Sequence, residues 1–104
     1  MNDQHADTVE QTRVEDQTRI TKPPMYQVIV FNDDFTTKEF VVGILVVIFH
    51  KSQADATELM WRVHRLGKGV AGVYPLEIAE TKIAAVTEMA RENGFPLKLA
   101  MEPE

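Results

Sequence analysis

The sequence of 104 residues contains no cysteine. This absence excludes a disulfide framework, a zinc site built from thiolates and catalysis by a cysteine nucleophile. A chain without disulfides needs no oxidising compartment. We therefore expect it in the reducing environment of the cytoplasm.

Long apolar runs and a basic charge balance are also missing. The longest apolar run, from Phe40 to Phe49, covers about ten residues and includes a glycine, whereas roughly 20 are needed to span a bilayer. The amino terminus lacks the basic start and apolar segment of a signal peptide. A net charge of -5 disfavours nucleic acid, which is gripped by clustered Lys and Arg. We expect a soluble protein without a membrane or nucleic-acid partner.

Catalytic and cofactor motifs are absent as well. No nucleophile elbow such as G-x-S-x-G occurs. A metal site is conceivable, but the two histidines that would contribute lack a short ligand spacing. Its ligands would be Asp33, Asp34, His50 and His64. We expect no enzymatic activity, no metal and no cofactor.

The composition changes at Lys22-Pro23-Pro24 and divides the chain into a tail and one domain. Residues 1–22 mix acidic, basic, Gln and Thr residues with scattered apolar ones, too few to offset the entropy of ordering the segment. We predict a mobile N-terminal extension over 1–22 and a folded domain over 23–104. Whether the extension is only a disordered end or reaches a partner stays open.

The first half of the domain predicts a strand and two helices. Tyr26–Phe31 is rich in β-branched and aromatic residues and is typical of a strand in the centre of a sheet. A capping box predicts a helix start at Thr36, with the Thr36 hydroxyl accepting the amide of Glu39. Ser52 offers the cap of a second helix, which Gly67 ends.

The second half predicts a short strand over 69–74, a helix after Pro75 that stops at Asn93-Gly94, and a last strand over Leu97–Met101. The third helix carries an apolar stripe that begins at Leu76. Its predicted solvent-facing positions are Glu77, Glu80, Lys82, Glu88 and Arg91. The order β-α-α-β-α-β indicates an α+β fold with three antiparallel strands covered by three helices.

Acceptor side chains follow the first strand directly, at Asn32-Asp33-Asp34. An α-ammonium group offers three N–H donors, which the Asn32 oxygen, one aspartate carboxylate and a neutral ring nitrogen of His64 would match. Met60, one helical turn before His64, and Val63 would add an apolar wall. This combination is typical of a site that recognises free N-terminal residues.

Plainer interpretations fit the same residues. Asn-Asp-Asp between a strand and a helix is the usual composition of a turn, because these side chains bond to nearby backbone amides. A lone histidine on a helix with apolar neighbours is most often a structural or a surface histidine, and Met60 and Val63 at helical spacing are typical of a core. From the residues alone, the amine site and the plain turn both remain open.

A series of motifs runs in unbroken order through residues 22–102: Lys22-Pro23-Pro24-Met25-Tyr26, Val30-Phe31-Asn32-Asp33-Asp34-Phe35-Thr36, Glu39-Phe40-Val41, Met60-Trp61-Arg62-Val63-His64, Gly67-Lys68-Gly69, Gly72-Val73-Tyr74, Glu77-Ile78-Ala79-Glu80-Thr81-Lys82 and Ala90-Arg91-Glu92-Asn93-Gly94-Phe95-Pro96-Leu97. Together they resemble the ClpS family, the adaptors that deliver N-degron substrates to the ClpA-ClpP protease.

The resemblance implies a role for each matching position. Asn32, Asp34 and His64 would hold the substrate's α-amino group, with Asp33 as a further candidate. The side-chain pocket, which would accept an N-terminal Leu, Phe, Tyr or Trp, would comprise Thr36, Lys38, Val41, Met60, Val63 and Leu97. Lys38 stands where well-known members carry an apolar gating residue, which puts the substrate range in question.

The resemblance also implies partners. Glu77 and Lys82 match the surface that contacts the N-terminal domain of a ClpA-type AAA+ unfoldase, and the tail matches the extension threaded toward it. We expect a monomeric adaptor. The alternative is a ClpS-like modulator that docks the unfoldase and diverts it from other substrates with little N-degron binding.

Overall fold

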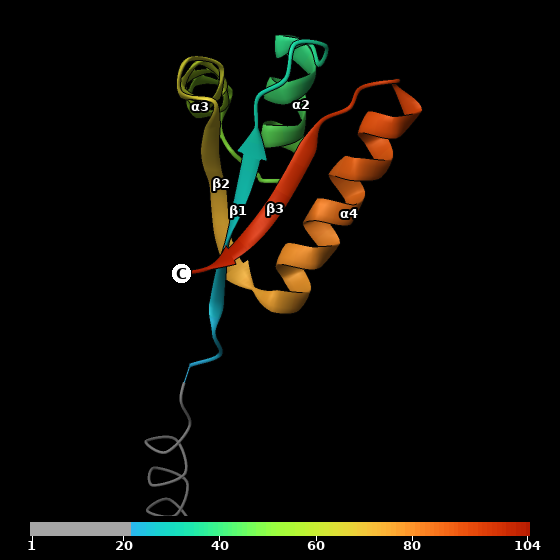
Figure 1. The fold of residues 1–104 in the computed structure, drawn as a ribbon. Coiled ribbons are helices and arrows are strands. Elements are labelled where there is room, and N and C mark those ends of the chain that lie inside the picture. The colour runs from blue at the N-terminus through green and yellow to red at the C-terminus, as the bar shows by residue number, and fades with distance from the viewer. Residues whose placement is uncertain (1–21) are drawn as a thin grey trace, which may run out of the picture.

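The computed structural model describes residues 22–104, which form six elements in the predicted order (Figure 1). Their bounds are Met25–Phe31 for β1, Lys38–Val47 for α2, Gln53–Leu66 for α3, Lys68–Pro75 for β2, Leu76–Glu92 for α4 and Lys98–Pro103 for β3. The predicted α+β fold is confirmed. Apart from Lys22, the predicted N-terminal extension lies outside the described residues.

The three strands form one antiparallel sheet in the order β2-β1-β3. The prediction that the first strand is central is therefore confirmed. The β-branched Val28, Ile29 and Val30 of β1 suit this position, since they are buried and such side chains pack well on the pleated surface of a sheet. The β1–β2 register shifts after Val28, which pairs with Gly72, while Ile29 pairs with Val70.

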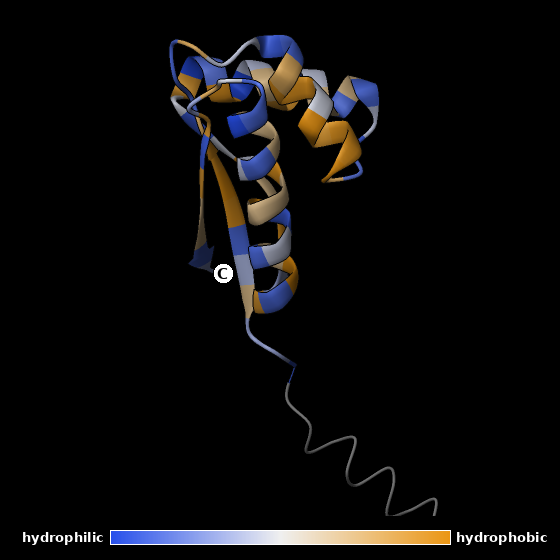
Figure 2. Ribbon diagram, turned by 90° about the vertical axis from the view of Figure 1, so that its right-hand side faces the viewer, coloured by the Kyte–Doolittle hydropathy of each residue, from blue (hydrophilic) through white to orange (hydrophobic). Residues whose placement is uncertain are grey.

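The core lies between the sheet and the helices. α4 runs along one face of the sheet, while α2 and α3 lie together at the end where β1 finishes (Figure 1). Val28 and Val30, two residues apart on β1, are both fully buried in the main core cluster. In the side view of Figure 2, α4 lies in front of the sheet and mixes hydrophilic with hydrophobic residues, as a helix with one buried face should.

The caps of α3 agree with the sequence. The Ser52 side chain accepts a hydrogen bond from the Asp55 amide at 3.1 Å, and Gly67 ends the helix in the left-handed conformation with φ of 93°. At α2 the predicted cap was wrong by one residue. Thr37, not Thr36, caps the helix by accepting the Phe40 amide at 3.2 Å.

The prediction that Lys82 of α4 faces solvent was wrong. Lys82 is half-buried, and its Nζ donates to the Ile48 carbonyl at 2.6 Å and lies 5.1 Å from the centroid of the Tyr74 ring. Ile48 is the C-cap of α2, where the last carbonyls of a helix need donors from outside it. Lys82 thus ties α4 to the end of α2.

The start of α4 differs from the prediction in a second respect. The predicted apolar stripe begins at Leu76, yet this side chain is 41% exposed, and the buried residues of the helix are Ala79, Val86 and Ala90. Leu76 is the first residue of α4. Helical side chains lean over the turn that precedes them, and a residue in the first turn has no such turn to cover.

Candidate functional site

The end of β1 is tied directly to the end of α3. The Asn32 amide donates to the Gly67 carbonyl at 2.9 Å, and Phe31 pairs with Lys68, the first residue of β2. Gly67 itself donates to the Val63 carbonyl at 2.8 Å. The acceptor-rich corner after β1 therefore lies next to the last turn of α3.

Replacing Gly67 with alanine should loosen this junction. Gly67 has φ of 93°, where a residue with a Cβ pays about 1 to 2 kcal/mol. No atom lies within 4 Å of an added Cβ, so the cost is conformational and not steric. Urea unfolding should show the loss, and Gly43→Ala, which meets equally open space within α2, should not lower stability.

Asp33 organises the loop after β1. Its Oδ1 accepts the amides of Phe35 at 2.8 Å and Thr36 at 2.6 Å, and its Oδ2 accepts the Thr36 hydroxyl at 2.7 Å. Because a carboxylate is a strong acceptor, it draws Thr36 into the turn and leaves the helix cap to Thr37. The turn interpretation of the acidic motif thus holds for Asp33.

The Asp33 turn should make stability depend on pH. Partial burial favours the neutral acid, but the bonds from the Thr36 hydroxyl and the amides of Thr36 and Phe35 outweigh it and lower the pKa of Asp33. The stabilisation is then present above the ordinary pKa of 3.8 and is lost as the pH falls through the lower pKa of the folded state. The free energy of unfolding, measured at pH 7 and pH 3, should fall less for Asp33→Asn than for the native chain. Equal losses would contradict this.

The loop, α2 and α3 enclose a cavity of about 410 Å³. Its lining residues are Asn32, Asp33, Asp34, Phe35, Thr36, Thr37, Lys38, Glu39, Val41, Met60, Val63 and His64. The structure thus brings together all but one of the residues expected to hold an amine or a side chain. The exception is Leu97, which is buried in the core cluster and does not line the cavity.

The sequence did not predict three of the lining residues: Phe35, Thr37 and Glu39. Their only signal was their place in the chain, between Asp34 and the first turn of the helix that follows. Glu77 and Lys82 lie on α4 and do not line this cavity.

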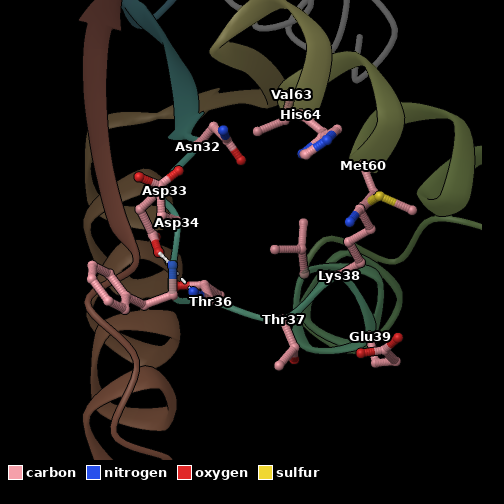
Figure 3. A pocket seen from close by; sticks show the side chains of 12 residues that line it. Asn32, Asp33, Asp34, Thr36, Thr37, Lys38, Glu39, Met60, Val63 and His64 are labelled. Carbon is pink, nitrogen blue, oxygen red and sulfur yellow. Dashed lines mark hydrogen bonds between the residues drawn. The ribbon is translucent and has the colours of Figure 1, made fainter.

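The cavity has a polar side and an apolar floor. Asn32, Asp33 and Asp34 lie on one side, opposite Lys38 and Met60, with Val63 and His64 between them (Figure 3). Asn32, Asp34 and His64 are exposed and line the cavity. The floor comes from Val41, Met60 and Val63, which are at most 7% exposed and also belong to the core.

The charges around the cavity favour a cation. The cavity is lined by three carboxylates, those of Asp33, Asp34 and Glu39, and by one ammonium group, that of Lys38. Within residues 22–104 no three His, Asp or Glu side chains gather closely enough to hold a metal ion. An organic cation that also carries an apolar group matches both parts of the cavity.

Among residues 22–104, no helix combines the length and the hydrophobicity required to cross a bilayer. The longest, α4, has 17 residues and carries charges along its length.

Comparison with known proteins finds close relatives. The family model described as ATP-dependent Clp protease adaptor protein ClpS matches residues 21–100. The ATP-dependent Clp protease adapter protein ClpS of Acetivibrio thermocellus is 56% identical, covering 91% of this chain and 98% of its own. That of Myxococcus xanthus is 54% identical, covering 83% of this chain and 80% of its own.

A solved structure is similar as well. The structure of Agrobacterium tumefaciens ClpS2 bound to L-phenylalaninamide aligns with a TM-score of 0.77 at 40% identity, over 80% of this chain and all of that one. The likeness thus extends from the sequence to the three-dimensional arrangement of the sheet and helices.

Proposed function

This chain belongs to the ClpS family, the adaptor proteins of the ATP-dependent Clp protease, and from that premise we propose that it recognises N-degron substrates. It is an adaptor and not an enzyme. In this proposal it binds the free α-amino group and the bulky side chain of an N-terminal Leu, Phe, Tyr or Trp. It then delivers the substrate to a ClpA-type AAA+ unfoldase for degradation by ClpP.

The observation that carries the proposal is that one cavity combines acceptors on one side with an apolar floor. An α-ammonium group has three donors, and the exposed Asn32, Asp34 and His64 offer one acceptor each, provided that His64 is neutral. Hydrogen bonds to a charged group contribute about 1.5 to 3 kcal/mol each. Three such bonds would account for recognition of the amine.

The apolar side would take the side chain. A cavity of about 410 Å³ lies in the range of small-ligand sites and suits one residue. Val41, Met60 and Val63 would contact that side chain, with Thr36 and Lys38 at its edge, whereas Leu97 would support the floor from the core. L-phenylalaninamide, the ligand of the Agrobacterium protein, combines a free α-amino group with a benzyl side chain, which are the same two features.

The proposal is tested by measuring the affinity of fluorescent peptides. The peptides begin with Phe, Leu or Gly, and each has either a free or an acetylated amino terminus. Free Phe and Leu peptides should bind well above the Gly peptide, and acetylation should abolish the difference because it removes the ammonium charge and two of its donors. If acetylation leaves the affinity unchanged, the cavity does not recognise the amine.

Delivery to the unfoldase would use α4, which does not line the cavity. Glu77 is exposed there and is the residue we propose for direct contact with the N-terminal domain of the unfoldase. Lys82 is the second proposed contact, but its ammonium already serves the Ile48 carbonyl. A loss of docking in Lys82 variants therefore needs a stability measurement beside it. The adaptor would act in the cytoplasm as a monomer.

The alternative function is a modulator that docks the unfoldase and diverts it from other substrates with little N-degron binding. The two functions differ in a degradation assay with a ClpA-type unfoldase and ClpP. A Phe-initiated protein should be degraded faster when the chain is present, and the Asp34→Asn variant should lose this effect. A modulator would slow other substrates equally with either variant.

A further inference from the structure

Trp61 on α3 stands beside the cavity without lining it, and three side chains surround its ring. The Nζ of Lys38 lies 5.5 Å from the ring centroid, and Cζ of Arg65 lies 5.9 Å from it. The His64 ring meets it edge-on, at 5.8 Å between centroids and 79° between planes. Trp61 is 39% exposed, so much of its indole is outside the core.

The side chain of Lys38 needs a partner such as the Trp61 ring to stay in one position. It is exposed at the first turn of α2, and a long lysine side chain loses rotamer freedom when it is held. An indole face is the best aromatic partner for an ammonium, and the Nζ of Lys38 lies within the range of a cation–π contact. Held there, the apolar stem of Lys38 lies along the cavity wall near Met60 (Figure 3).

We propose that Trp61 is a positioning residue that holds Lys38 as one wall of the cavity, so that the pair limits the size of the N-terminal side chain admitted. This rests on the proposed function, in which the cavity takes that side chain. With the ammonium held on the indole, the wall favours Leu over the larger Trp. Without the indole, the lysine swings into water and the cavity opens on this side.

The contact with His64 gives Trp61 a second conceivable effect, which the test separates. A displaced His64 would weaken one bond to the ammonium, and every free-amine peptide would lose the same factor. A displaced Lys38 would change the ranking of side chains. The ratio of affinities for Trp- and Leu-initiated peptides therefore reports on Lys38 alone.

The experiment measures this ratio by fluorescence anisotropy for the native chain and for Trp61→Ala. We expect the ratio to shift toward Trp about two- to five-fold, the size of one exposed cation–π contact. Arg65→Ala is the matched control, because it removes the other cation near the same ring but does not line the cavity. It should leave the ratio unchanged.

Two further sets of variants test whether Trp61 acts through Lys38 and whether another aromatic ring can replace it. In a Lys38→Ala background, Trp61→Ala should cause no further shift, because the residue that it positions is gone. Trp61→Phe keeps an aromatic face and should stay near the native ratio, whereas Trp61→Leu should behave like Trp61→Ala. This second pair also serves if the alanine variant does not fold.

Two results would overturn the inference: an unchanged ratio in Trp61→Ala and Trp61→Leu, or a shift that persists without Lys38. Acetylated peptides, measured alongside, distinguish a failure of this inference from a failure of the proposed function. If acetylation weakens binding while the ratio stays fixed, the amine site stands and the role of Trp61 is wrong.

Discussion

Asp34→Asn should lower the affinity for free-amine peptides about 10- to 100-fold, the largest binding effect that we expect from one substitution. The change keeps the size of the side chain but removes its charge, and a bond to a charged group contributes about 1.5 to 3 kcal/mol. Asp34 is exposed, in contrast to Asp33, whose two oxygens are already bonded within the loop. Its carboxylate is therefore available to a ligand.

Anisotropy titrations with a Phe-initiated peptide measure the loss. Asp55→Asn is the matched control, because Asp55 is also an exposed aspartate but lies at the start of α3, away from the cavity. Salt should weaken binding to the native chain more than to Asp34→Asn, since screening acts on the charge that the variant lacks. An affinity within two-fold of native would remove Asp34 from the proposed amine site.

Leu45→Ala should cause the largest loss of stability, about 2 to 5 kcal/mol. Leu45 is fully buried in the core cluster and lies on α2, the helix that also carries Val41 and Lys38. Removing its side chain leaves a hole that close-packed neighbours fill only in part. Because α2 forms one wall of the cavity, peptide affinity should fall together with stability.

Urea unfolding followed by circular dichroism measures this loss. Val47→Ala is the control on the same helix, because Val47 is 61% exposed and its replacement should change stability by less than about 0.5 kcal/mol. Equal effects of the two substitutions would show that α2 is not held by its buried face.

Local signals predicted most of the fold. Ser52 and Gly67 bound the second helix in the sequence as in the structure, because a cap and a left-handed stop depend on residues only a few positions away. The same locality explains the error at the first helix. Thr36 and Thr37 are chemically equivalent candidates for the cap, and the choice depended on the Asp33 carboxylate, which takes the Thr36 hydroxyl.

Long-range contacts account for the error at Lys82. Lys82 occupies a position that helical periodicity places in solvent, yet Ile48, 34 residues earlier, presents a carbonyl to it. Leu97 is buried in the core cluster beside the cavity's apolar residues, and its role in the side-chain pocket stays a prediction. Periodicity gives the direction of a side chain around its own helix and not the identity of what it meets.

The amino-acid sequence by itself determined the order of the elements, the central position of β1 and the acceptors Asn32, Asp34 and His64, because these depend on local propensity, capping and residue chemistry. Only the tertiary structure decided that these acceptors share a cavity with the apolar side chains of Val41, Met60 and Val63. Asn32 meets the end of α3 through the Gly67 carbonyl, and Lys38 meets Trp61 across two helices. Such contacts arise from the packing of separate elements, which no local pattern encodes.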